Sequence, residues 1–147
     1  MTVRELVYGL ISNDSELATL GLTPDTLFAN GAPDSPPDAP GKIWAVLRWG
    51  AETGALLGGA ARGRGHVSER DCELWVYSRE DDFGDINQAI KRWCAVMDGL
   101  EATRTGVGPV DGWVVATQWQ GDSADGWDDV YAANYRSSAY TIVASGD

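Results

Sequence analysis

The sequence predicts an α+β domain with a four-stranded mixed or antiparallel sheet. An N-terminal helix and one long amphipathic helix would pack on one face of it. Apolar residues recur at helical spacing near the N-terminus and again over residues 83–100. Four other segments, which start at residues 42, 70, 112 and 130, have the apolar pattern of strands. Helices and strands do not alternate regularly along the chain, which favours α+β over parallel α/β.

The composition is that of one globular domain over residues 1–147. The chain is 44% hydrophobic and contains seven tryptophans, enough to bury a core. It has 22 acidic against 11 basic residues and a formal charge of −11, which disfavours a protein that grips nucleic acid by neutralising phosphates. The start, MTVRELVYGL, lacks a secretory pattern, and no apolar run is long enough to cross a bilayer. We therefore expect no membrane association, and two reduced cysteines in a cytosolic setting.

The first helix begins at a capping box. Thr2 is followed three residues later by Glu5, and each side chain can bond the other residue's backbone N–H. The apolar face that follows consists of Val3, Leu6, Val7, Leu10 and Ile11. A short second helical turn is expected over residues 16–20, with Asn13 or Asp14 as its cap and Gly21 as its end.

Residues 22–41 break this regularity. The segment holds five of the six prolines and no Lys or Arg. Its PDSPPDAPG run can propagate neither a helix nor a central strand. We interpret it as an ordered surface excursion, or partly as a linker.

The first two strand segments, KIWAVLRWG and RDCELWVYS, are apolar on both faces. Two helices can cover only one face of the sheet, yet Trp44, Trp75 and Tyr77 fall on the other. Such an uncovered face would be an unusually large exposed apolar patch for a monomer. The pattern therefore predicts that another copy of the chain covers part of it.

Between these strands lies a glycine-rich arm, residues 50–69, which includes GALLGGAARGRG. It has no G-x-x-x-x-G-K-[ST] phosphate loop, and no third glycine or helix to complete a dinucleotide fingerprint. Two hypotheses stay open. One is an unstructured tether. The other is an arm that orders against a partner, with Arg62 and Arg64 giving its distal half a basic character.

The second helix, residues 83–100, has a narrow apolar stripe and a charged opposite face, and Asp81 or Asp82 could cap it. Two strands follow, GWVVATQW and VYAANYRSSAYTIVA, which we expect to form an antiparallel hairpin. Their acidic connector contains Asp122, Asp125, Asp128 and Asp129. The spacing does not match a calcium loop of the EF-hand kind, so a solvated hairpin tip is expected.

No catalytic motif stands out. His66 is the only histidine and lies in the glycine-rich arm, where no rigid partner would hold it for acid–base chemistry. One histidine and two cysteines 22 residues apart do not give zinc-ligand spacing. We expect no enzymatic activity, no cofactor and no metal.

The segment WQGDSADGWDDVYAANYRSSAYTIV, with IWAVLRWG and FGDINQAIKRWCAVMDGL before it, resembles the tail terminator proteins of siphophages that infect actinobacteria. In that family a hairpin tip of the form W-x-G-x-S-x-D-x-x-D precedes a return strand of the form R-x-x-x-[YF]-x-[IV]. The matching residues here are Trp119, Gly121, Ser123, Asp125, Asp128, Arg136, Tyr140 and Ile142.

The resemblance implies a structural virion protein, assembled in the host cytoplasm, that forms a ring of identical subunits, expected to be a hexamer. The ring would cap the tail tube, end its polymerisation and join it to the head-completion (stopper) protein, while DNA passes through the lumen without specific binding. An acidic lumen would repel phosphates. Within the ring, the glycine-rich arm would order against a neighbouring subunit, the tube or the docking partner.

The apolar sheet face and the resemblance together predict which residues lie at interfaces between subunits. Arg48, Arg70 and Arg136 could pair with acids of a neighbouring subunit, and the alternative for each is an intrachain or solvated ion pair. Two other functions stay open. One is a different head–tail junction ring or a tail-tube subunit, and the other is a monomeric ligand-binding or enzymatic domain.

Overall fold

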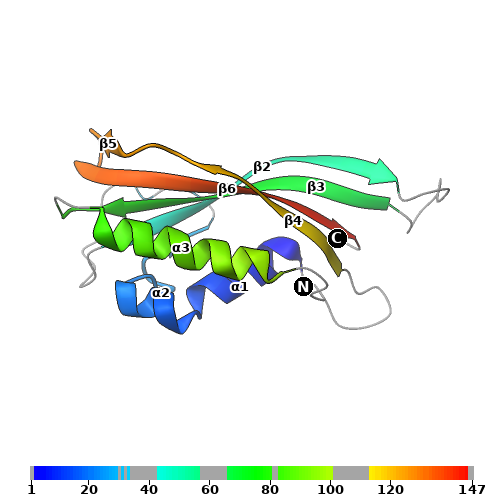
Figure 1. The fold of residues 1–147 in the computed structure, drawn as a ribbon, viewed down its shortest axis with the longest axis horizontal. Helices are drawn as coiled ribbons and strands as arrows, with labels where there is room; N and C mark the ends of the chain where they lie inside the picture. Colours follow the sequence, from blue (N-terminus) through cyan, green and yellow to red (C-terminus); the bar gives the residue numbers. More distant parts are fainter. Residues whose placement is uncertain are drawn as a thin grey trace.

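The computed structural model describes residues 2–29, 31, 33, 43–56, 66–80, 83–100 and 113–145. Three helices and six strands follow one another along this part of the chain (Figure 1). The helices are α1 (Val3–Ser12), α2 (Ser15–Leu20) and α3 (Gly84–Asp98). The strands are β1 (Leu27–Phe28), β2 (Ile43–Leu56), β3 (His66–Ser78), β4 (Trp113–Asp122), β5 (Gly126–Asp128) and β6 (Ala133–Ser145).

The sheet is mixed and has six strands, not the four expected. Its order is β1-β2-β3-β6-β4, and β5 pairs with β6. The four expected strands form its antiparallel centre. The two additional strands are short: β1 pairs in parallel with residues 45–46 of β2, and β5 pairs with residues 133–135 of β6. Strands of two and three residues are too short to show the alternation of apolar and polar residues by which a strand is predicted.

All three helices lie on one face of the sheet (Figure 1). The main core fills the space between the two layers, and it includes Ile43, Leu47, Leu74, Trp93 and Ile142. The expected capping box is present: Thr2 Oγ1 accepts from the Glu5 N–H at 3.1 Å, and Glu5 Oε2 accepts from the Thr2 N–H at 2.8 Å. α2 is capped by Asp14 and ends at Gly21 with φ +107°, a left-handed conformation that favours glycine.

Two details of the helices differ from expectation. Leu10, assigned to the buried face of α1, is 40% exposed. α3 has Phe83 as its N-cap residue and no side-chain cap, and Asp81 and Asp82 fall outside the described residues. The apolar stripe of α3 itself is confirmed, with Ile86, Ile90, Trp93 and Met97 buried.

Much of the expected glycine-rich arm is β-structure. β2 continues to Leu56 and β3 begins at His66, and their antiparallel pairing runs from Ile43↔Ser78 to Leu56↔His66, with an irregularity between Trp49 and Glu52. The described parts of segment 50–69 are therefore the paired ends of two antiparallel strands, because β2 and β3 pair from Glu52↔Arg70 to Leu56↔His66. These paired ends project beyond the helix layer (Figure 1). Arg62 and Arg64 lie outside the described residues.

The second sheet face is covered from within the chain, which corrects the expectation for Trp44 and Tyr77. Trp44 is 2% exposed and Tyr77 is 1% exposed in the single chain. They form a second core with Val46, Tyr131 and Ala133, and Phe28 packs against it. Tyr131 comes from the turn between β5 and β6, and its ring meets those of Trp44 and Tyr77 edge-on, at centroid distances of 6.0 and 5.2 Å. A neighbouring subunit is not needed to bury Trp44 and Tyr77.

One ion pair ties the helices together. Asp14, the cap of α2, accepts from Arg92 of α3, with Arg92 Nη2 2.7 Å from Asp14 Oδ1. The hydrogen bonds from Arg92 lower the pKa of the Asp14 carboxyl below its ordinary value of 3.8. A lowered folded-state pKa means that the ionised carboxylate favours the folded chain.

We therefore predict a pH-dependent contribution from Asp14. Its stabilisation is complete above the unfolded-state pKa and disappears as the pH falls through the lower folded-state pKa, so the loss begins at about pH 5 and grows downward. Asp14→Ser keeps an N-cap oxygen but removes the charge. Urea unfolding across this range should give a shallower loss of stability for Asp14→Ser than for the natural chain. Equal pH slopes for the two proteins would contradict the prediction.

Candidate interaction surface

The outer sheet face carries an aromatic pair, Trp75 and Tyr135, with the exposed Arg48 over one of its rings. Trp75 of β3 stacks on Tyr135 of β6 at a centroid distance of 5.3 Å, and Arg48 of β2 lies over the Trp75 ring at 4.6 Å. The Trp75 indole N–H also donates to Glu73 at 2.7 Å. Trp75 is half-buried and Arg48 is exposed. Of the three aromatic residues expected at an interface, Trp75 alone keeps substantial accessible surface.

The hairpin tip between β4 and β5 is organised around Arg136. Arg136 Nε donates to the Ser123 carbonyl at 3.2 Å and lies 3.5 Å from Asp125 Oδ1, and its Nη2 is 3.8 Å from Asp122 Oδ2. A further hydrogen bond joins Arg136 to Asn87 of α3. Within this chain, Arg136 therefore serves as an intramolecular anchor, as in the alternative that the sequence left open.

Other residues of the tip also have structural partners. The Trp119 indole donates to Asp122 at 3.1 Å, and Ser123 bonds the backbone of Ser137 through both its N–H and its hydroxyl. Asp128 Oδ1 accepts from the Tyr131 N–H at 2.9 Å. Four acids were expected at a lumen or tip. Asp122 and Asp125 contact Arg136, and Asp128 contacts the Tyr131 N–H. Asp129 is exposed, and its carboxylate has no partner among the described residues.

Arg70 is the second cation with an intramolecular role. It is 5% exposed, its guanidinium lies 3.0 Å from Glu52 Oε1 on the neighbouring strand, and it also bonds Ser68. Cross-strand pairing at Glu52↔Arg70 places the two charges side by side. Arg70 is thus buried in the single chain.

A groove that the sequence pattern does not predict runs along the free edge of β2. It has a volume of about 730 Å³ and is lined by Arg4, Glu5 and Tyr8 of α1, by Leu27, Phe28, Ala29 and Gly31, and by Trp49 of β2. An adjoining hollow of about 430 Å³ shares four of these residues and extends to Arg48. We call the two together the β2-edge groove. Its residues are far apart in sequence, so only tertiary packing assembles them.

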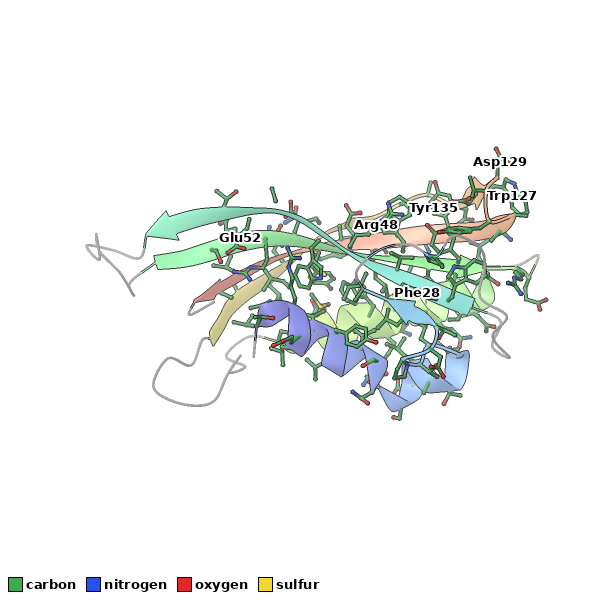
Figure 2. The ribbon with its side chains drawn as sticks, turned by 180° about the vertical axis from the view of Figure 1, so that it is seen from behind. Phe28, Arg48, Glu52, Trp127, Asp129 and Tyr135 are labelled. Atoms are coloured by element: carbon green, nitrogen blue, oxygen red, sulfur yellow. The ribbon has the colours of Figure 1, made fainter. Side chains whose placement is uncertain are left out.

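A second feature missed by sequence reasoning lies at β5 and the turn after it. Trp127 is 57% exposed and Val130 is 83% exposed. With Asp129 they form what we call the β5 knob, and Figure 2 shows Trp127 and Asp129 at one end of the sheet. The other large exposed apolar residues among those described are Leu10 and Trp119.

Sites for other chemistry are not seen in the described part of the chain. No group of three His, Cys, Asp or Glu side chains there could hold a metal ion. None of the described helices combines the length and apolar character needed to cross a membrane. The side chain of His66 falls outside the described residues. Cys72 is buried in the core and Cys94 is half-buried, and both are free thiols.

Comparison with known proteins identifies the fold. No family model matches the sequence, and no curated protein matches it. Among solved structures, the chain is similar to a chain from the virion of a native gene transfer agent particle, with a TM-score of 0.65 and 19% sequence identity. The similarity covers 98% of this chain and 95% of that chain. The two chains therefore share a fold over nearly their whole lengths.

Proposed function

We propose that this chain is a non-enzymatic structural protein of a phage-like virion, located at the tail end of the head–tail junction. In this proposal, identical subunits form a closed ring that caps the tail tube, ends its polymerisation and joins it to the head-completion protein. DNA would pass through the lumen of the ring. The hexameric subunit number expected from the sequence resemblance is part of the proposal.

The observation that carries the proposal is the full-length likeness in fold to a chain of a gene transfer agent virion. The sequence resemblance to tail terminator proteins is independent of this likeness in fold, because it depends on the hairpin-tip and return-strand motif. Residues of that motif have structural contacts in this chain: Arg136 contacts Ser123 and Asp125, and Asp128 separately accepts from the Tyr131 N–H. The motif thus corresponds to a hydrogen-bonded hairpin tip and the turn after it.

Trp44 and Tyr77 are covered by Tyr131 of the same chain, so their burial does not require a ring. A ring is supported instead by two exposed surfaces at different sheet edges, the β5 knob and the β2-edge groove. β4 and β5 lie on one edge, because β3 occupies the whole other side of β6, and β2 borders the opposite edge. If these different edges bind each other, the contact is head to tail, and head-to-tail contacts form a ring where the rotation between subunits closes.

The proposal is tested with the tail-tube protein from the same genome. The tube protein is polymerised alone and together with this chain, and tube lengths and ends are recorded by negative-stain microscopy. We expect shorter tubes with one extra ring at an end. Long cylinders made of this chain alone would instead identify a tail-tube subunit. Tubes of unchanged length without added density would overturn the proposal.

A deletion of residues 54–65 in the same assay tests the assembly arm expected from the sequence. If the glycine-rich segment acts between subunits or against the tube, the deletion should reduce capping. Because it removes the end of a hairpin, circular dichroism must first show a folded protein. Unchanged capping and unchanged head joining would show that the segment is only a connection between β2 and β3.

A further inference from the structure

The β2-edge groove has the character of a binding site for an acidic, partly apolar segment. Its apolar lining includes Tyr8, Phe28 and Trp49, and its cation is Arg4. Arg48 borders the adjoining hollow, with its guanidinium over the Trp75 ring of β3. Arg4 lies over the Trp49 ring at 5.4 Å, so its guanidinium stands in the groove. Aromatic residues and arginine are the types enriched at the centres of protein interfaces.

The charge of the groove is opposite to that of the whole chain. The protein has a formal charge of −11, yet neither Arg4 nor Arg48 has a carboxylate within ion-pair distance among the described residues. The one acid in the lining, Glu5, is already engaged, because its Oε2 accepts from the Thr2 N–H in the capping box. The groove therefore offers the Arg4 guanidinium to an incoming acid.

The groove also offers backbone groups. β1 pairs with β2 only at Ala45 and Val46. From Leu47 onward, the edge of β2 that faces away from β3 has no strand partner among the described residues. An open strand edge beside apolar pockets is the geometry on which an extended segment adds as a further strand.

The β5 knob has the complementary chemistry. Trp127 and Val130 are more than half exposed, and Asp129 between them has no partner among the described residues. β5 itself pairs only with β6. Tyr131, the next residue after Val130, is fixed in the second core, and Asp128 bonds its N–H. The knob is thus an aromatic, an acid and an aliphatic side chain presented on an anchored turn.

We infer that the β5 knob of one subunit seats in the β2-edge groove of the next. Trp127 and Val130 would meet the apolar lining, and Asp129 would pair with Arg4. The occupant is a second copy of this chain, because the exposed Trp127, Asp129 and Val130 complement the apolar lining and the Arg4 guanidinium of the groove, and β5 pairs at the other side of the sheet from β2. Figure 2 shows Trp127 and Asp129 at the end of the sheet, away from Arg48 and Phe28. This inference rests on the proposed ring and specifies its contact.

Site-specific cross-linking tests the contact. Val130→Cys is made in one preparation and Gly31→Cys in another, both with Cys94→Ala, and Cys72 remains buried. A Cβ at Gly31 meets no atom within 4 Å, so this substitution is tolerated locally. A short bis-maleimide is used because it avoids the strict geometry of a disulfide. The mixture should give cross-linked dimers, and either variant alone should stay uncross-linked. In the control mixture, Val130→Cys is combined with Thr19→Cys, a substitution at an exposed position of α2, and no cross-linked dimer is expected.

A charge swap gives an independent readout of the same contact. Arg4→Glu should weaken association by roughly tenfold, because like charges then face each other across the interface. Adding Asp129→Lys to Arg4→Glu should restore association. Lys91→Glu on the exposed face of α3 changes the net charge equally and should have little effect. Native mass spectrometry over a concentration series measures all four proteins.

The outcomes separate this contact from the ring itself. Cross-links confined to the Val130→Cys and Gly31→Cys mixture, together with rescue by the charge swap, support the inference. Val130→Cys homodimers would overturn it, since they require a symmetric contact. Capped tubes without the cross-link would also overturn it but leave the ring standing. Neither cross-links nor rings would overturn both.

Discussion

Trp44→Ala is expected to destabilise the single chain by about 3–5 kcal/mol, the usual loss for truncating a buried tryptophan. Trp44 is 2% exposed and stacks on Tyr77 at 5.5 Å, and Tyr131 meets it edge-on at 6.0 Å. Its removal would leave a cavity beneath the turn that covers the second face. Urea unfolding followed by circular dichroism measures the loss.

The matched control is Trp127→Ala, which removes an indole that is 57% exposed. Its effect on the stability of the dilute chain should stay within about 0.5 kcal/mol. The comparison separates the two roles assigned to tryptophan in this protein, one in a core and one at a contact. Similar losses for the two variants, or a loss at Trp44 that depends on protein concentration, would show that the second face is closed by another subunit after all.

The second large effect is expected at Gly126. A Cβ built there would lie 2.5 Å from Cε1 and Cζ of the Tyr135 ring, so that ring packs directly on the glycine backbone. Gly126→Ala must displace Tyr135, which also stacks on Trp75. We expect a loss of about 1–3 kcal/mol, typical of overpacking. Thermal unfolding of the variant and the natural chain would measure it.

Two further variants show whether the clash is the cause. At Gly9, within α1, an added Cβ meets no atom within 4 Å. Gly9→Ala should therefore stabilise the chain by about 0.5–1 kcal/mol, because glycine is unfavourable inside a helix. In a Tyr135→Ala background, Gly126→Ala should lose most of its cost. A cost that persists without the ring would place its origin in the backbone of β5.

The sequence pattern predicted both faces of the central strands correctly. Ile43 and Leu47 belong to the main core, whereas Trp44 and Val46 belong to the second core, as the period-two alternation of a strand requires. The helical spacing was equally informative for the buried stripe of α3. These predictions succeeded because each depends on the local geometry of one element.

The cover of the second face could not be predicted, because it depends on where the chain turns. Tyr131 was expected in a strand that began at residue 130, but β6 begins at Ala133. Ala132 has φ +50°, a conformation uncommon for a residue with a Cβ, and this turn brings Tyr131 over Trp44 and Tyr77. Local patterns carry no signal for such a turn. They therefore suggested an exposed face where the fold has a closed one.

The contacts of the predicted interface residues also depend on tertiary packing, which local sequence patterns do not predict. The strand position of Arg48 predicts an interface residue, and Arg48 borders the β2-edge groove with its guanidinium over Trp75. Arg70 and Arg136 were selected on similar grounds, but their partners are Glu52, Ser123 and Asp125 of the same chain. The β2-edge groove joins residues of α1, β1 and β2, whose proximity follows only from the packing of the helix layer and the parallel pairing of β1.

The most direct measurement is an electron cryomicroscopy map of this chain assembled on the tip of its tube. The proposed account predicts one closed ring per tube end, with the β5 edge of each subunit against the β2 edge of the next and an open lumen for DNA. A tube tip without this chain, or a stack in which the chain repeats along the whole tube, would contradict it.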